Sequence, residues 1–201
     1  TDIRESHTGM DALTHAIESY ITPGAWVMSD MFELKAIEMI AQNLKAAVDN
    51  GKDVAAREAM SQAQYIAGMG FSNVGLGIVH SMAHPLGAFY DTPHGVANAL
   101  LLPYVMEYNA ESPAAPKYIH IAKAMGVDTT GMSEAEGVKA AIEAVKALSI
   151  SINIPQKLHE INVKEEDIPA LAVAAYNDVC TGGNPRPTSV ADIEALYHKA
   201  F

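Results

Sequence analysis

The histidine-rich stretch from Val79 to His94, with the sequence VHSMAHPLGAFYDTPH, limits the fold more than any other part of the chain. It holds three of the eight histidines, together with two prolines and a glycine that constrain the backbone between them. His80 and His84 are four residues apart, so on a helix their rings lie on one face. Such a stretch requires a scaffold that gives its rings a common partner.

A second polar pair lies near the N-terminus, in the segment GMDALTHAIE. Asp11 and His15 have the same spacing as His80 and His84, so one helix face can offer a carboxylate oxygen and an imidazole nitrogen to one cation. Burying so many polar groups without a shared partner would cost about 1–3 kcal/mol for each unsatisfied group. The two segments together therefore predict a metal site.

His94 opens another predicted helix, whose positive end favours the neutral imidazole, the form that binds metal. Spacing alone leaves alternatives open. Asp11 can be only the acid of a helix cap, and His80 and His84 can both be ligands. The other four histidines lie in polar settings and are interpreted as surface residues without partners: His7, His120, His159 and His198.

The ligand types indicate a class of metal. Imidazoles with one carboxylate and no thiolate suit Fe(II), Zn(II), Ni(II) or Mn(II), and spacing does not choose among them. Three imidazoles and one carboxylate around a divalent ion leave a net charge of about +1. Such a site is a Lewis acid, which can lower the pKa of an alcohol hydroxyl or polarise a carbonyl.

Apolar residues recur at helical spacing along most of the chain, and no segment shows the alternation typical of a strand. We predict an all-α domain of eight or nine helices, with an irregular lead-in over residues 1–8 and one metal-binding domain over residues 9–201. The expected helices begin at or near Thr8, Ser29, Val54, Pro93, Lys117, Ser133, Pro155, Glu166 and Ser189.

Two Gly-x-Gly pairs require a test for a dinucleotide-binding loop. After Gly68 and Gly70 the third glycine of the fingerprint is replaced by Asn73, and after Gly75 and Gly77 it is replaced by His80. Neither pair follows a strand-like segment, so neither fits the motif. We predict no nucleotide-binding α/β domain within this chain.

Composition and charge exclude several classes of partner. The 201 residues are 49% hydrophobic and 18% charged, which is typical of a globular protein, and the net charge is −11. An acidic surface disfavours nucleic acid and anionic membranes. The single cysteine, Cys180, cannot form an intrachain disulfide, and no transmembrane segment is predicted. We expect a cytoplasmic location.

Three segments together resemble the C-terminal half of the iron-dependent (group III) alcohol dehydrogenases: GMDALTHAIE, GLGIVHSMAHPLGAFYDTPHGVANALLLP and DVCTGGNPR. The similarity extends from about Gly9 to Phe201 and is greatest to the branch of the lactaldehyde:1,2-propanediol oxidoreductases and 1,3-propanediol dehydrogenases. It implies the helical C-terminal domain of the dehydroquinate synthase-like fold.

The resemblance also assigns roles to individual residues. It implies that His84 lies beside the nicotinamide and the reacting carbon and is not a ligand. The implied metal ligands are Asp11, His15, His80 and His94, and the implied lining of the substrate pocket is Phe71 and Cys180. The implied cofactors are Fe(II), with Zn(II) or another divalent metal as alternatives, and NAD(P).

The activity implied by the resemblance is oxidoreduction of a small alcohol or aldehyde, such as a diol or a primary alcohol. Family members carry an upstream nucleotide-binding domain, so we expect such a domain as partner and little or no activity without it. The ligand-bearing face would then be exposed, and we expect homo-oligomers through it. The alternative is a stand-alone helical metal-binding module without activity. A helical phosphohydrolase is disfavoured, because no His-Asp dipeptide occurs.

Overall fold

The computed structural model describes residues 3–201, and within this range the chain is all-α, with nine α-helices and no strand. The fold class is therefore as predicted. The α-helices are α1 (Ile3–Ile21), α2 (Val27–Asp49), α3 (Val54–Val74), α4 (Ile78–Tyr90), α5 (His94–Asn109), α6 (Tyr118–Ala124), α7 (Glu134–Ser151), α8 (Ile168–Tyr176) and α9 (Val190–Ala200). Short 3₁₀ turns join them: η1 (Ala115–Lys117), η2 (Leu158–Ile161), η3 (Glu165–Asp167) and η4 (Val179–Gly183).

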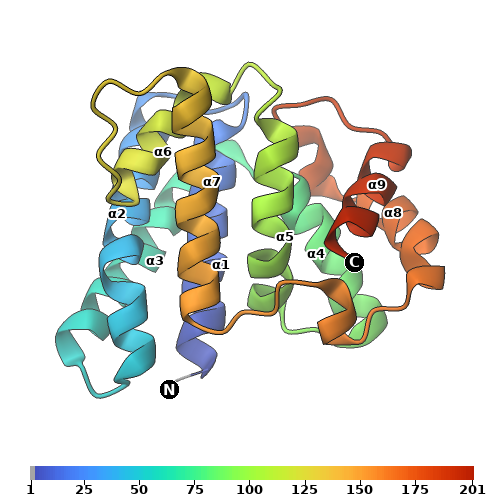
Figure 1. Ribbon diagram of the computed structural model, residues 1–201, viewed down its shortest axis with the longest axis horizontal. Coiled ribbons are helices and arrows are strands. Elements are labelled where there is room, and N and C mark those ends of the chain that lie inside the picture. Colours follow the sequence, from blue (N-terminus) through green and yellow to red (C-terminus); the bar gives the residue numbers. More distant parts are fainter. Residues whose placement is uncertain (1–2) are drawn as a thin grey trace.

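Helix α1 runs through the middle of the molecule and packs against α2, α3 and α5 (Figure 1). Helices α8 and α9 pair with each other at the opposite end from α2 and α3, and α4 packs between α5 and α8. The apolar residues at helical spacing form the core, as Ile37, Leu44 and Val48 of α2 illustrate by their complete burial. This arrangement places the two polar segments of the sequence on α1 and α4, which both pack against α5.

The start of α1 differs from the prediction. The helix begins at Ile3, so the expected irregular lead-in is wrong for residues 3–8, while residues 1 and 2 lie outside the described part. Thr8 does not cap the helix. Its hydroxyl donates to the carbonyl of Arg4 at 3.0 Å, a bond that threonine can make inside a helix. Asp11 is consequently two turns inside α1, and the interpretation of Asp11 as a capping acid is excluded.

Several predicted helix ends are confirmed by their capping contacts. The backbone N–H of Ser133 donates to Glu136 at 2.8 Å, and that of Ser189 donates to Asp192 at 2.8 Å, so both predicted capping boxes form. Other boundaries shift. Ser29 lies at the third helical position of α2 rather than at its cap.

Two further boundaries affect the site directly. Helix α3 continues past the predicted end near Met69 as far as Val74, which places Phe71 on a helix. Pro93 is the residue before α5 rather than its first residue, so His94 is the first residue of that helix. Among the described residues, no helix combines the length and the apolar character needed to cross a bilayer.

Candidate metal centre

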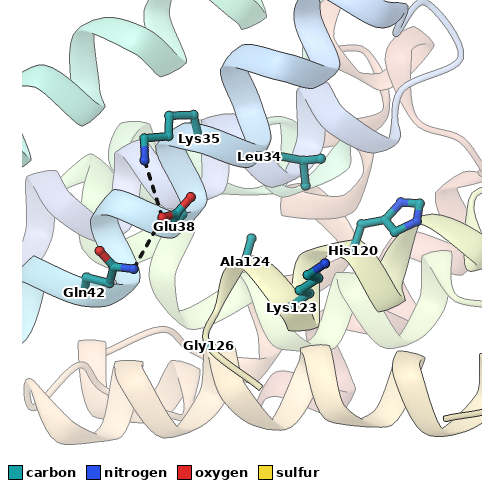
Figure 2. Close-up of a pocket in the computed structure, with 8 residues that line it drawn as sticks. All are labelled: Leu34, Lys35, Glu38, Gln42, His120, Lys123, Ala124 and Gly126. Carbon is teal, nitrogen blue, oxygen red and sulfur yellow. Dashed lines mark hydrogen bonds and ion pairs between the residues drawn. The ribbon is translucent and has the colours of Figure 1, made fainter. Parts of the chain in front are cut away.

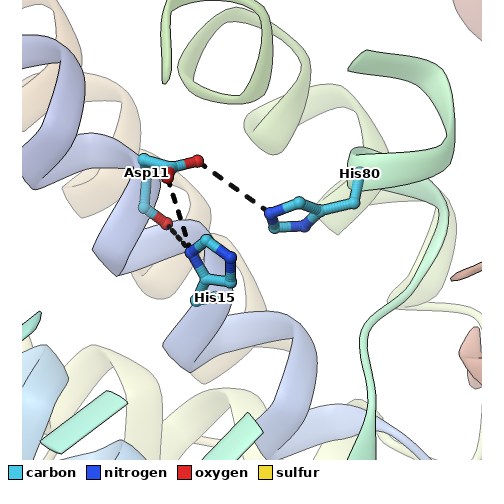
Figure 3. A group of neighbouring side chains, drawn as sticks. All are labelled: Asp11, His15 and His80. Carbon is cyan, nitrogen blue, oxygen red and sulfur yellow. Dashed lines mark hydrogen bonds and ion pairs between the residues drawn. The ribbon is translucent and has the colours of Figure 1, made fainter. Parts of the chain in front are cut away.

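Asp11 and His15 of α1 and His80 of α4 converge on one point (Figure 3). Each offers one ligand atom, and these atoms all lie within 4.8 Å of one another. His80 Nε2 is 3.9 Å from Asp11 Oδ1, and His15 Nδ1 is 3.7 Å from Asp11 Oδ2. The predicted convergence of the two sequence segments is therefore present in the fold.

The ring of His15 is fixed by contacts on both faces. Its Nδ1–H donates to the backbone carbonyl of Asp11 at 2.8 Å, which leaves the Nε2 lone pair free for another partner. Phe71 stacks on the ring at 4.4 Å between centroids and 28° between planes, and the ring of His80 lies 4.3 Å away. Burial, followed by the neighbouring His80, lowers the pKa of His15 and favours the neutral ring.

His80 is almost fully buried and is held at one nitrogen only. Its Nδ1–H donates to the carboxylate of Glu18 at 2.5 Å. Its Nε2 is buried without a hydrogen-bond partner and faces Asp11. Burial lowers the pKa of His80, but the carboxylates of Glu18 and Asp11 outweigh this effect, so the pKa is raised overall. The position between Asp11 and His80 therefore favours positive charge, and the donor set fits a divalent cation.

His94 lies at the rim of this cluster. Its Nε2 is 3.4 Å from Asp11 Oδ1, and its ring centroid is 5.4 Å from that of His80. Its pKa is lowered, as expected, although the largest cause is burial. The buried amide of Asn98 reaches both groups: its Nδ2 donates to Asp11 Oδ1 at 2.6 Å and lies 3.0 Å from His94 Nε2. Asn98 therefore holds the ring of His94 beside the carboxylate of Asp11.

His84 belongs to a second, neighbouring group. Its Nδ1–H donates to Asp178 at 2.7 Å, and its ligand atom lies within 4.8 Å of those of Asp178 and Cys180, not of the Asp11 cluster. Its ring stacks on that of His94 at 5.4 Å and 15°. Burial, followed by the nearby charge of Asp178, raises the pKa of Cys180 to about 12, so this residue stays a neutral thiol.

The remaining histidines lie outside both groups, but the expectation that they lack partners is wrong for three of them. His120 shares a hydrogen bond with the hydroxyl of Tyr20 at 2.8 Å, and His159 bonds the carbonyl of Phe201 at 2.7 Å. His198 lies 3.6 Å from Glu165. His7 is partly buried against α5. His120, His159 and His198 thus have local structural partners, and none of the four histidines belongs to a group of potential metal ligands among the described residues.

Three polar partners of the site were not singled out from the sequence. They are Glu18, which bonds His80; Asn98, which bonds Asp11; and Asp178, which bonds His84. Two of them carried a weak signal. Glu18 lies three residues after His15, and Asn98 lies four residues after His94, so each is on the same helix face as a ligand.

The hollow between α2 and α6 does not include the residues of this centre. One hollow of about 580 Å³ lies between α2 and α6, where Lys35 and Gln42 pair with Glu38 along α2 and His120 lines the opposite wall (Figure 2). Lys35 and Gln42 meet only at Glu38, and neither group of potential metal ligands found among the described residues lines this hollow. The convergence of ligands, rather than the size of a cavity, identifies the candidate site.

Comparison with known proteins identifies the family of the chain. The family model for the C-terminal region of Fe-containing alcohol dehydrogenases matches residues 5–201. Lactaldehyde reductase of Escherichia coli (strain K12) is 60% identical over 194 residues, which cover 96% of this chain and 50% of that protein. A 1,3-propanediol dehydrogenase of Klebsiella pneumoniae is 46% identical over the same share of each. The chain thus spans about half the length of these relatives.

Solved structures share the fold. A crystal structure of 1,3-propanediol oxidoreductase superposes with a TM-score of 0.95 at 46% identity, over 98% of this chain and 51% of that one. An alcohol dehydrogenase from Oenococcus oeni gives a TM-score of 0.95 at 38% identity, over the same shares. By sequence and by fold, this chain belongs to the Fe-containing alcohol dehydrogenase family and corresponds to its C-terminal region.

Proposed function

We propose that this chain is the metal-binding, catalytic domain of an NAD(P)-dependent alcohol dehydrogenase. The observation that carries the proposal is the buried Nε2 of His80, which has no hydrogen-bond partner and faces the carboxylate of Asp11. A buried nitrogen in this state is costly unless a cation or donor completes it. The family relationship supports the same assignment. The proposed domain comprises residues 9–201.

Asp11, His15, His80 and His94 would hold the metal. The set of three imidazoles and one carboxylate suits Fe(II), and also Zn(II) or another divalent ion. When bound, such an ion supplies a Lewis acid that lowers the pKa of an alcohol hydroxyl and polarises a carbonyl. The chain supplies a cluster in which Asp11, His15 and His80 each offer a ligand atom within 4.8 Å of the others, and the Nε2 of His80 is buried without a partner.

His84 would handle the hydroxyl proton and lie next to the nicotinamide. Alcohol oxidation removes a hydride, which NAD(P) accepts, and a proton, which a base must carry away. The Nδ1–H of His84 is held by Asp178, so its Nε2 is the basic atom, and the ring is exposed on the side away from the core. His84 would accept the proton at Nε2 and release it to solvent.

Phe71 and Cys180 would line a small substrate pocket. Phe71 stacks on His15, and the neutral thiol of Cys180 adjoins Asp178, so each adds a largely apolar surface beside one of the two histidine groups. Such a lining favours small alcohols or aldehydes, including short diols. Relatives that carry the names lactaldehyde reductase and 1,3-propanediol dehydrogenase support this substrate class.

A nucleotide-binding domain upstream would provide the NAD(P) site. The chain covers half of its relatives, and no described segment provides a strand or a glycine fingerprint for a dinucleotide. We therefore expect the 201-residue chain alone to have little or no dehydrogenase activity. Self-association through the face that carries the ligands also stays a prediction.

A pair of substitutions tests the roles of the two histidine groups. The variants are made in a protein in which this chain follows its nucleotide-binding domain. His80→Ala should remove both bound metal, measured by elemental analysis, and turnover of 1,2-propanediol with NAD. His84→Ala should keep the metal and lower turnover. Loss of metal in both variants would refute the division of roles, and normal metal content in His80→Ala would refute the site.

The second candidate is a metal-binding helical module without activity. The absence of strands in the described residues favours it for the isolated chain. Turnover of 1,2-propanediol by the purified 201-residue chain at a rate comparable to that of a complete dehydrogenase would exclude this candidate. Metal binding without turnover, even after a nucleotide-binding domain is supplied, would support it.

A further inference from the structure

Glu18 is a buried acid that the proposed chemistry does not use. It lies on α1, three residues after His15, and only 2% of its surface is exposed. Both of its carboxylate oxygens accept hydrogen bonds from α4: Oε2 from the ring of His80 at 2.5 Å, and Oε1 from the backbone N–H of Val79 at 2.7 Å. An ionised carboxylate in such a position requires strong compensation.

The first consequence concerns the ring of His80. An acceptor at Nδ1 keeps the proton on that nitrogen, so the lone pair of the neutral ring is on Nε2, the atom that faces Asp11. Without the carboxylate, the proton is free to move to Nε2 and block that position. The contact also fixes the plane of the ring, because the same carboxylate accepts a second hydrogen bond, from the backbone N–H of the adjacent residue Val79.

The second consequence concerns the helix that carries His80. The residue before α4 is Gly77, which has no side chain to accept a bond from the first free N–H groups of the helix. Glu18 accepts the N–H of Val79 in its place and brings a negative charge to the positive end of α4. A Cβ at Gly77 would lie 3.0 Å from Glu18 Oε1 and 3.1 Å from Asn184 Oδ1, so the glycine leaves room for this contact.

The third consequence concerns charge. Asp11 alone would leave a divalent ion with a net positive charge in a largely buried cluster. The carboxylate of Glu18, one imidazole away from Asp11, brings the sum of the ion and the two acids to zero. The negative charge of Glu18 and the positive charge of a bound cation therefore reduce each other's cost of burial, with the ring of His80 between them.

We propose that Glu18 is the positioning residue of the metal centre: it sets the tautomer of His80, caps the helix that carries it and balances the charge of the ion. The inference rests on the proposed metal site. In other metal centres, removal of such a partner lowers affinity by roughly 10–100-fold, and we expect the same range for Glu18→Gln. Glutamine would present an amide to two donors, so at least one of the two contacts would be lost.

The test uses the metal-free 201-residue chain, titrated with Co(II) by visible absorption and with Zn(II) in competition. The variants are Glu18→Gln and, as a matched control, Glu33→Gln, which replaces another buried acid that touches no ligand ring. We expect the Kd for Co(II) to rise at least 10-fold in Glu18→Gln and to change less than 2-fold in the control. Equal affinity of a folded Glu18→Gln variant and the parent chain would overturn the proposal.

A second measurement keeps the proposal testable if Glu18→Gln does not fold. In the Zn(II)-loaded parent chain, long-range ¹H–¹⁵N NMR spectra of the His80 ring should show a protonated Nδ1 and a metal-bound Nε2. Metal on Nδ1 would overturn the proposal while leaving the metal site itself intact. Failure of the parent chain to bind Co(II), Zn(II) or Fe(II) would instead refute the proposed function on which the inference rests.

Discussion

The imidazole of His84 on α4 and the carboxylate of Asp178 at the start of η4 form a hydrogen bond of 2.7 Å between Nδ1 and Oδ2. The carboxylate is itself held in place, because it accepts the backbone N–H of Cys180 at 2.8 Å. Burial raises the pKa of Asp178, but the bonds from Cys180 and His84 outweigh it and lower the pKa overall. Asp178 is therefore ionised at neutral pH and directs the opposite nitrogen of His84 away from itself.

Replacement of Asp178 by asparagine should slow turnover without removing the metal. Asparagine fits the same space but lacks the negative charge that fixes the proton on Nδ1 of His84. A positioned base contributes about 10²–10⁴-fold to catalysis, and we expect kcat of the complete dehydrogenase to fall at least 10-fold, with metal content unchanged. The control is Glu166→Gln, which changes an exposed acid. Metal loss in Asp178→Asn would show that this residue belongs to the other group.

The sequence predicts which candidate ligands share a helix face because this information is local. Asp11 and His15, like His80 and His84, are one helical turn apart, and this spacing places each pair on one face before any tertiary structure is known. The capping box at Ser133 is local in the same way. The class of fold and the helix face on which each pair lies therefore follow from patterns within short stretches.

The partners of the ligands could not be predicted in the same way, because they depend on tertiary packing. The bond from His80 to Glu18 spans 62 residues, and that from His84 to Asp178 spans 94. The start of α1 was missed for a related reason. Ser6 lies in a polar segment without an apolar pattern, yet it is buried by the rest of the fold. Propensity does not contain that information.

Metal binding should stabilise the chain against unfolding. A ligand at 100 times its Kd adds about 2.7 kcal/mol to the free energy of unfolding, and for a domain of this size this corresponds to a rise of roughly 5–10 °C in Tm. We expect this rise on addition of Zn(II), its reversal by chelator and its absence in His80→Ala. His120→Ala, which removes a ring bonded to Tyr20, should keep the full shift. An equal shift in His80→Ala would argue against the site.

Glu33 should make stability depend on pH. This residue lies on α2, its side chain is fully buried against Gly70 of α3, and one of its oxygens has no partner. Ser19 Oγ lies 2.6 Å from the other oxygen and 2.5 Å from the carbonyl of His15. The hydroxyl of Ser19 is the donor in both contacts, so its bond to Glu33 only partly offsets the burial of the carboxyl group. Burial raises the pKa of Glu33 to about 8.

The sign of the effect follows from this raised pKa. Above pH 4.5 the unfolded chain releases the proton of Glu33, while the folded chain keeps it until about pH 8. The stability contributed by this group is therefore complete below pH 4.5 and is lost as pH rises to 8, at up to about 1.4 kcal/mol per pH unit. Glu33→Gln keeps an acceptor for the hydroxyl of Ser19 and removes the titration. In denaturant titrations with chelator present, the free energy of unfolding of Glu33→Gln should exceed that of the parent chain by an amount that grows between pH 5 and 8. A constant difference would contradict the assignment.

Gly95 should be the least replaceable glycine between the two ligand helices α1 and α5. A Cβ at this position would lie 2.1 Å from the backbone carbonyl oxygen of His7, and backbone cannot rotate away as a side chain can. We expect Gly95→Ala to lower the free energy of unfolding by about 1–3 kcal/mol. It should also weaken metal binding, because α1 carries Asp11 and α5 carries His94.

Gly68→Ala is the matched control: a Cβ there meets open space, and alanine should stabilise α3 by up to about 1 kcal/mol. Denaturant titrations of both variants, followed by Co(II) titration, check the pair. Equal effects of the two substitutions would show that the close approach of α1 to α5 is not what requires the glycine.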